Sequence, residues 1–176
     1  MNRIWPVILA LVLGVCLIGQ AEELPQTIER NVPLEGTNET RTYTLVKDVQ
    51  SRFSIYVDEG IYEAVQNDDG MTIQQKDGGS AKMVLTYQDG TPTKLRDAFV
   101  TPQMKQDDSF WTEEFESPCA GCSVVYEEKG VARSLYWFTA GKGKTLVADF
   151  SLKPEEQEGH GVRMWDMLDT LTFTSE

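Results

Sequence analysis

Between residues 41 and 90, apolar and polar residues alternate with a period of two, which is typical of half-buried β-strands. The clearest segment is FSIYV, in which Phe53, Ile55 and Val57 occupy alternate positions. Asp-Gly and Gly-Gly pairs separate such segments, and these pairs suit the positive φ angles of tight hairpins. The pattern predicts strands at residues 42–46, 53–57, 61–66, 71–75 and 82–88.

The period changes to that of a helix at two places. Thr91 is a favourable N-cap and Pro92 suits the first helical position, so a short helix is predicted at residues 92–100. A longer C-terminal helix is expected to begin near His160, because apolar residues then recur at helical spacing, namely Met164, Trp165, Leu168 and Leu171. Strands are predicted before and after it, at residues 123–128, 132–139, 145–152 and 171–173.

The N-terminal segment 1–21 has the three parts of a secretory signal peptide. Arg3 supplies the positive charge, residues 7–18 are almost wholly apolar, and the small residues Gly19 and Ala21 suit a signal peptidase. Cleavage is expected between Ala21 and Glu22. The alternative is an uncleaved membrane anchor, but the apolar run of about 15 residues is shorter than the roughly 20 that span a bilayer.

A second alternative for the N-terminus is lipid attachment. The run Leu13-Gly14-Val15-Cys16 is similar to the signal of bacterial lipoproteins, which would anchor the chain at Cys16. The expected location is therefore secreted or periplasmic, that is extracytoplasmic, with a lipid anchor at the membrane surface as the alternative. No transmembrane span is expected in the mature chain.

Two regions follow the signal. The polar segment 22–40 contains Pro25 and Pro33 and is expected to be a linker or a loosely docked N-terminal arm. Residues 41–176 hold all the predicted strands and helices and are expected to form one domain.

Composition and charge exclude several classes of protein. Hydrophobic residues make up 40% and charged residues 25% of the 176 residues, which is usual for a globular protein and excludes a collagen-like, disordered or polytopic membrane chain. With 16 Lys and Arg against 28 Asp and Glu, the net charge is -12. An acidic surface repels phosphate backbones, so nucleic acid is not expected as a partner.

The pair Cys119 and Cys122 is the most distinctive local motif. Outside the cytoplasm two cysteines favour a disulfide, and the β-branched residues after Cys122 predict a loop entering a strand. A redox Cys-x-x-Cys instead precedes a helix, and zinc needs about four ligands, whereas His160 is the only histidine. A structural disulfide is therefore predicted, with redox catalysis or metal binding as alternatives. His160 is expected to be exposed at the start of the helix.

Residues 106–117 combine carboxylates with aromatic side chains. The carboxylates lack the Asp-x-Asp-x-Asp-Gly order of a calcium loop, so no metal site is predicted. If Phe110, Trp111 and Phe115 are exposed, they form a contact patch for a protein or a glycan. No catalytic constellation and no cofactor site is recognisable.

Three segments resemble the PsbP-like family. RFSIYVDEGIYEA is similar to its early strand and turn, YWFTAGKGKTLVADFSL to its late hairpin, and MWDMLDTLTF to its closing helix and strand. The resemblance implies an α+β sandwich in which a central antiparallel sheet carries a short helix and a C-terminal helix. It also implies a noncatalytic binding or assembly role.

The prediction is thus an exported noncatalytic domain that binds a protein or a cell-envelope component. The alternative is an exported redox or metal-binding protein that uses Cys119 and Cys122.

Overall fold

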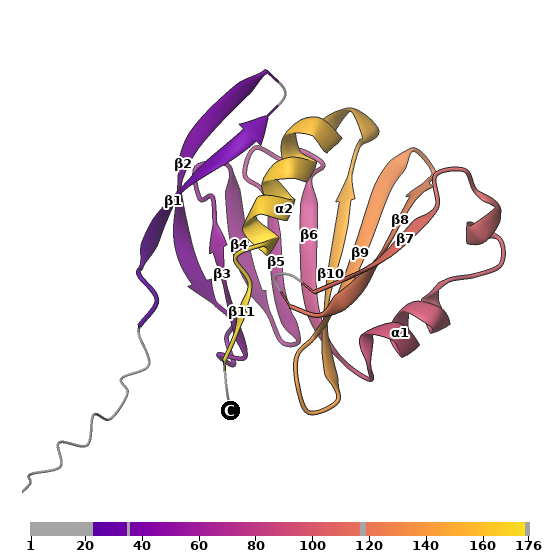
Figure 1. The fold of residues 1–176 in the computed structure, drawn as a ribbon. Helices are drawn as coiled ribbons and strands as arrows, with labels where there is room; N and C mark the ends of the chain where they lie inside the picture. The colour runs from indigo at the N-terminus through magenta and orange to yellow at the C-terminus, as the bar shows by residue number, and fades with distance from the viewer. Residues whose placement is uncertain (1–22, 35, 117–118, 175–176) are drawn as a thin grey trace, which may run out of the picture.

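Two antiparallel sheets make up most of the structure, a computed structural model that describes residues 23–34, 36–116 and 119–174. The smaller sheet has the order β1-β2-β3-β11, with bounds Thr27–Leu34, Thr37–Lys47, Phe53–Val57 and Thr172–Phe173 (Figure 1). The larger sheet has the order β4-β5-β6-β10-β9-β8-β7, with bounds Tyr62–Asn67, Gly70–Gln75, Lys82–Asp89, Lys144–Leu152, Val131–Thr139, Gly121–Glu128 and Trp111–Phe115.

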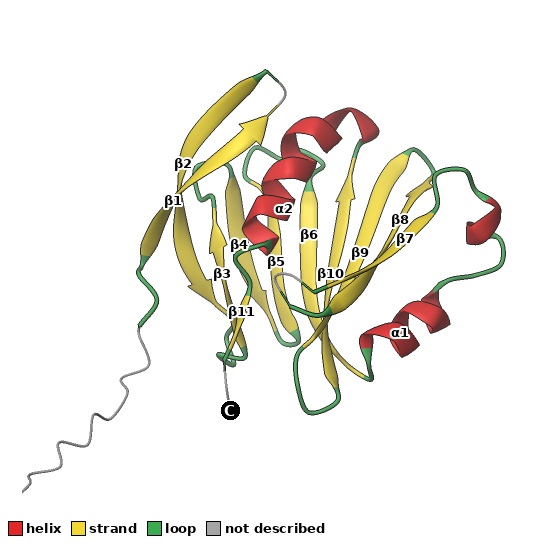
Figure 2. Ribbon diagram, viewed as in Figure 1, coloured by secondary structure: helices red, strands yellow, loops and turns green. Residues whose placement is uncertain are grey.

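The two α-helices pack on opposite faces of the larger sheet. Helix α1 (Pro92–Phe99) contacts β8 and β9 and is followed by the short helix η1 (Met104–Gln106). Helix α2 (Val162–Leu168) crosses the other face, beside the smaller sheet, and contacts β1 and β3 (Figure 2). It is preceded by η2 (Pro154–Glu156) and by the π-helical turn η3 (Gln157–Gly161).

Each face of the larger sheet therefore has its own apolar cluster. On the α2 side, Met164, Met167 and Leu168 have no exposed surface and pack into a cluster that also includes inward residues of both sheets. The smaller cluster on the α1 side consists of Cys122, Val124, Leu135, Trp137 and Val147, packed against residues of and after α1. Strand β9 is covered on both faces, as its apolar side chains at successive positions predict.

Most predicted elements are present, with boundaries that shift by one or two residues. Strand β3 spans 53–57 as predicted, and α1 begins at Pro92 but ends at Phe99. The strand predicted at 42–46 is the last half of β2, which starts at Thr37. An α+β antiparallel architecture is confirmed, but the strands form two sheets rather than one central sheet.

The segment 22–40 differs from the linker or loose arm expected there. Residues 27–34 form β1, which pairs with β2 from Thr27 opposite Thr44 to Leu34 opposite Thr37. Val32 on β1 is fully buried. Pro33 is tolerated because β1 is an edge strand, where one backbone donor is not needed for pairing.

Ion pairs hold this hairpin against α2. Arg30 donates through Nη2 to Asp166 Oδ1 at 2.7 Å and to Asp169 Oδ2 at 3.1 Å. Arg163 Nη2 lies 2.9 Å from Glu39 Oε2 on β2. The hairpin is thus fastened to the rest of the fold by charged contacts as well as by Val32.

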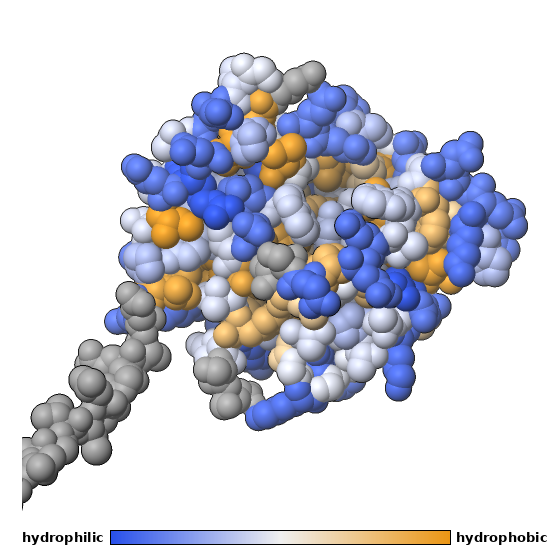
Figure 3. All heavy atoms as spheres, viewed as in Figure 1, coloured by the Kyte–Doolittle hydropathy of each residue, from blue (hydrophilic) through white to orange (hydrophobic). Residues whose placement is uncertain are grey.

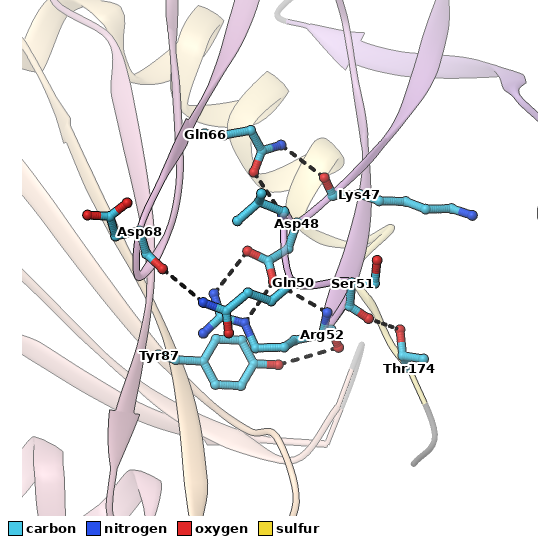
Figure 4. A network of polar contacts seen from close by, with 10 residues as sticks. Lys47, Asp48, Gln50, Ser51, Arg52, Gln66, Asp68, Tyr87 and Thr174 are labelled. Carbon is cyan, nitrogen blue, oxygen red and sulfur yellow. Dashed lines mark hydrogen bonds and ion pairs between the residues drawn. The ribbon is translucent and has the colours of Figure 1, made fainter.

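A polar network joins the β2–β3 turn to the larger sheet and to the C-terminal strand (Figure 4). Arg52 donates through Nε and Nη2 to the buried carboxylate of Asp48 at 2.7 and 2.9 Å, and its guanidinium lies 4.4 Å from the centre of the Tyr87 ring. Gln50 Nε2 donates to the Asp68 carbonyl at 3.1 Å, and Thr174 Oγ1 donates to the Ser51 carbonyl at 2.6 Å. One turn thereby contacts three other parts of the chain.

Truncation of the buried face of α2 should destabilise the fold. Leu168 is fully buried, so Leu168→Ala removes apolar contacts and leaves a cavity. We expect the free energy of unfolding to fall by about 2–5 kcal/mol, measured by urea denaturation. The control Val49→Ala, at a site that is 63% exposed, should change it by less than about 0.5 kcal/mol. Equal effects of the two variants would contradict this packing.

The Asp48–Arg52 pair should make stability depend on pH. Burial alone would raise the pKa of Asp48, but hydrogen bonds from the side chain and backbone of Arg52 hold that pKa below its ordinary value. The ion pair therefore stabilises the fold fully at pH values above the pKa of Asp48 in the unfolded chain, which is about 3.9. This stabilisation is lost as the pH falls through the lower pKa of Asp48 in the folded protein.

Asp48→Asn should therefore lower the free energy of unfolding at pH 7 by about 1–3 kcal/mol, because Arg52 loses its anion. The difference from the wild type should shrink below about pH 4, measured by denaturation at a series of pH values. Asp68→Asn, at an exposed site, is the control. A gap that stays constant from pH 7 to pH 3 would show that the charge of Asp48 does not contribute.

Candidate functional site

The predicted N-terminal features cannot be placed on the fold. The signal peptide at residues 1–21, the cleavage between Ala21 and Glu22 and the lipid anchor at Cys16 all concern residues 1–22, which lie outside the described residues. In the part of the chain that is described, no helix combines the length and apolar character needed to cross a membrane.

The two cysteines are both free, so the predicted disulfide is not present in the structure. Cys122 is the second residue of β8 and is fully buried in the cluster on the α1 side. Cys119 is half-buried and packs against the cluster on the α2 side. The two thiols therefore face different apolar clusters, which is why a spacing of three residues does not bring their sulfur atoms together.

Gly121 in this motif has a packing role. It lies opposite Phe115 on β7 and Phe138 on β9. A Cβ at this position would come within 2.3 Å of the Trp137 carbonyl oxygen and 2.8 Å of the Phe115 ring. The absence of a side chain thus lets the Phe115 ring lie over the start of β8.

The environment of the thiols suppresses their reactivity. Burial raises the pKa of Cys119 to about 11, and burial also raises the pKa of Cys122. Since the thiolate is the nucleophile and the metal ligand, both cysteines are almost wholly protonated at neutral pH. In a redox-active Cys-x-x-Cys the thiol pKa is lowered, which is the opposite of the shifts found here. Among the residues described, no group of three or more His, Cys, Asp and Glu side chains is close enough to hold a metal ion.

The three aromatic residues expected to form one contact patch lie in three environments. Phe110 packs against the α1-side cluster, whereas Phe115 lies in the α2-side cluster with its ring centre 5.3 Å from that of Phe138. Trp111 is 60% exposed. Trp111 and Phe115 are both on the α2-side face of β7, because side chains alternate along a strand.

An open pocket of about 230 Å³ lies on the α1 side of β7. Its lining residues are Arg96, Asp97, Val100, Lys105, Phe110 and Thr112. The charge of Arg96 is compensated within the fold, because its guanidinium lies 3.0 Å from Asp97 Oδ1 and 3.1 Å from Glu114 Oε1. Phe110 is therefore a wall of this pocket and not part of the surface that bears Trp111.

Strand β7 forms one edge of the larger sheet. It pairs with β8 from Trp111 opposite Val125 to Phe115 opposite Gly121. Along the described residues, no strand pairs with its second side. Four of its residues are exposed, from Trp111 to Glu114. Figure 3 shows this side of the molecule with hydrophilic residues over most of its surface and hydrophobic residues in smaller areas between them.

Seven of the 28 acidic residues of the sequence lie in the segments around this edge. Residues 107–128 contain no Lys or Arg and seven exposed carboxylates, Asp107, Asp108, Glu113, Glu114, Glu116, Glu127 and Glu128. Hydrogen bonds from the Ser109 hydroxyl and backbone amide lower the pKa of Asp107. Apart from Glu114, none of the seven has an ion pair within the described chain. The edge thus carries a net negative charge, although Arg96 and Lys105 line the pocket on its α1 side.

The prediction that His160 is exposed at the start of a helix is wrong. His160 is half-buried within η3, and its Nδ1 lies 2.7 Å from the hydroxyl of the buried Tyr62 on β4. The two rings meet edge to face with centres 5.8 Å apart. Burial raises the pKa of Tyr62 well above its ordinary value, so its hydroxyl stays protonated in this contact.

Sequence reasoning missed β7 itself. Trp111, Thr112 and Phe115 have high β-propensity, but two glutamates separate them and conceal the alternation. The sequence pattern therefore indicates only that the segment is acidic and aromatic. The exposed edge follows from the sheet order, which depends on pairing between distant strands.

Comparison with solved structures identifies the fold. The solution structure of cyanobacterial PsbP (CyanoP) from Synechocystis aligns with 75% of this chain and 92% of its own chain, with a TM-score of 0.54 and 9% sequence identity. At this identity the likeness concerns the fold alone, and it confirms the PsbP-like fold that the sequence motifs indicated. A scan against protein families found no match, and neither did a search of curated proteins.

The free thiols give a direct test. At pH 8, Cys119 in the folded protein should react with iodoacetamide about a hundredfold more slowly than a free cysteine, because so little thiolate is present. The rate should rise about tenfold per pH unit towards pH 11. Intact-mass and peptide analysis would locate the label.

In denaturant without reductant, both cysteines should label quickly if they are free. Labelling that needs prior reduction would instead show that the predicted disulfide forms. Fast labelling of the folded protein at pH 8 would contradict the raised thiol pKa values.

Proposed function

We propose that this protein is an extracytoplasmic, noncatalytic domain that binds another protein through the edge of its larger sheet. The observation that carries the proposal is Trp111, a large aromatic side chain that is 60% exposed on an edge strand. Tryptophan is among the residues most enriched at binding hot spots, and its exposure costs free energy in an unbound protein.

The surroundings of Trp111 support a binding surface. Trp165 on α2 is also exposed, at 38%, on the same side of the larger sheet, where its ring centre lies 5.0 Å from that of Tyr136. Two partly exposed tryptophans lie on one side of the molecule, next to a strand edge that no other described strand pairs with. A partner protein can cover such features.

The proposal that the chain is noncatalytic rests on its titratable groups. The two thiols have raised pKa values, and His160 is bonded to the hydroxyl of Tyr62. Neither arrangement places an activated nucleophile beside a base in an open pocket, which is what covalent catalysis requires. Among the described residues, the raised thiol pKa values and the lack of a cluster of metal-ligating side chains give no support to the alternative of a redox or metal-binding protein.

The test is site-specific photo-crosslinking in the cells that make the protein. A benzophenone amino acid in place of Trp111 should give defined adducts with an extracytoplasmic protein. The matched control places the same group at Val65, which is 43% exposed on β4, the opposite edge strand of the sheet. Adducts at position 111 only are expected.

A competition experiment measures the contribution of the indole ring. Purified wild-type protein should suppress the adduct, whereas Trp111→Ala should need about a thirtyfold higher concentration, as for a hot-spot residue. Val65→Ala should compete like the wild type. No adduct at 111, equal adducts at 111 and 65, or full competition by Trp111→Ala would overturn the proposed function.

A further inference from the structure

The outer side of β7 carries backbone groups that are free to pair. In an antiparallel sheet, residues of an edge strand alternately direct their amide and carbonyl groups towards the neighbouring strand and away from it. Strand β8 occupies one side of β7, and no strand among the described residues occupies the other (Figure 1). The opposite edge strand, β4, differs because it contacts β3.

Proteins usually protect such an edge, and here the protection is electrostatic. Glu113 and Glu114 are consecutive exposed residues of β7, so one carboxylate lies on each face of the strand. Charged residues on an edge strand discourage pairing with an identical edge, because like charges lie opposite one another. A second copy of this chain is therefore a poor occupant of the edge.

The same charges favour a cationic strand. The segment 107–128 contains seven carboxylates and no Lys or Arg. Of the two glutamates on β7, Glu114 has an ion pair within the described chain and Glu113 has none. Opposite charges across a strand pair stabilise it, and an Arg or Lys placed over Trp111 would add a cation–π contact.

We infer that β7 binds an extended, positively charged segment of a partner protein, which adds to the larger sheet as an eighth strand. This inference rests on the proposed function, since it specifies how the partner of the Trp111 surface is recognised. Backbone hydrogen bonds to β7 supply affinity, and alternate side chains of the added strand supply specificity.

The geometry defines the sequence that the edge would select. On the α2 side, residues of the added strand lie opposite Trp111 and Glu113, which favours Lys or Arg at positions two apart. On the α1 side they lie opposite Thr112 and Glu114, next to the pocket wall formed by Phe110, which favours an apolar residue of moderate size. Alternation of basic and β-branched residues meets both conditions.

The experiment uses three labelled decapeptides and the purified protein. The first alternates Val and Lys, the second alternates Val and Glu, and the third is the Val-Lys peptide with all of its backbone amides N-methylated. The third keeps the charge of the first but has no backbone N–H to donate along either edge. Fluorescence anisotropy measures binding, and hydrogen exchange measures protection of the backbone amides of residues 111–115.

We expect the Val-Lys peptide to bind, the Val-Glu peptide not to bind, and the N-methylated peptide to bind at least about tenfold more weakly. Protection should appear within β7. The double variant Glu113→Lys with Glu114→Lys should lose about tenfold in affinity for the Val-Lys peptide. The matched control, Asp68→Lys with Asp69→Lys, has the same change in net charge at the distant β4–β5 turn and should bind like the wild type.

The other outcomes overturn the inference in distinguishable ways. If the N-methylated and unmodified Val-Lys peptides bind equally, the contact is electrostatic and involves no strand pairing, so the inference fails. In that case the proposed function still stands if the crosslink at Trp111 is obtained. If no peptide binds, or the acidic peptide binds equally, the cationic strand is excluded. If the crosslink at Trp111 also fails, the proposed function fails with it.

Discussion

The fold depends on the burial of one amphipathic helix between two sheets. Met164, Met167 and Leu168 of α2 are completely buried, and they complete a cluster to which both sheets contribute. Without this helix, the apolar faces that the two sheets direct towards it would be exposed to water. A sheet can bury an apolar face only by packing it against another layer of structure. The ion pairs of Arg30 and Arg163 then fasten the β1–β2 hairpin to the same helix.

This arrangement has a consequence for the edges of the larger sheet. Strand β4 lies near β3, at the junction of the sheets, whereas β7 is at the far end and has no covering layer on its outer side within the described chain. An open edge is an aggregation hazard unless charged side chains, a bulge or a covering segment protects it. The concentration of carboxylates at residues 107–128 is consistent with that need, and it also selects against acidic partners.

In the Cys-Ala-Gly-Cys motif, the fold separates two side chains that are close in the sequence. Two cysteines outside the cytoplasm favour a disulfide, yet Cys119 and Cys122 are free in the structure and pack into clusters on opposite faces of the sheet. The residue in the motif with the strictest geometric requirement is Gly121, which has no room for a Cβ beside Trp137 and Phe115. Spacing in the sequence gives the distance along the chain. Whether two side chains meet depends on which face of the sheet each of them points to.

The sequence by itself determined the secondary structure of most of the chain, including β3, α1 and the strands β8 to β10, because alternation and helical spacing are local properties. It also determined the PsbP-like fold through its motifs. It did not reveal β1, whose prolines suggested a linker, or β7, whose glutamates concealed its strand character. Only the tertiary structure decided that Phe110, Trp111 and Phe115 separate, and that Trp111 stands on an open edge. The physical reason is that sheet order and exposure arise from pairing between residues far apart in the chain, which no local pattern encodes.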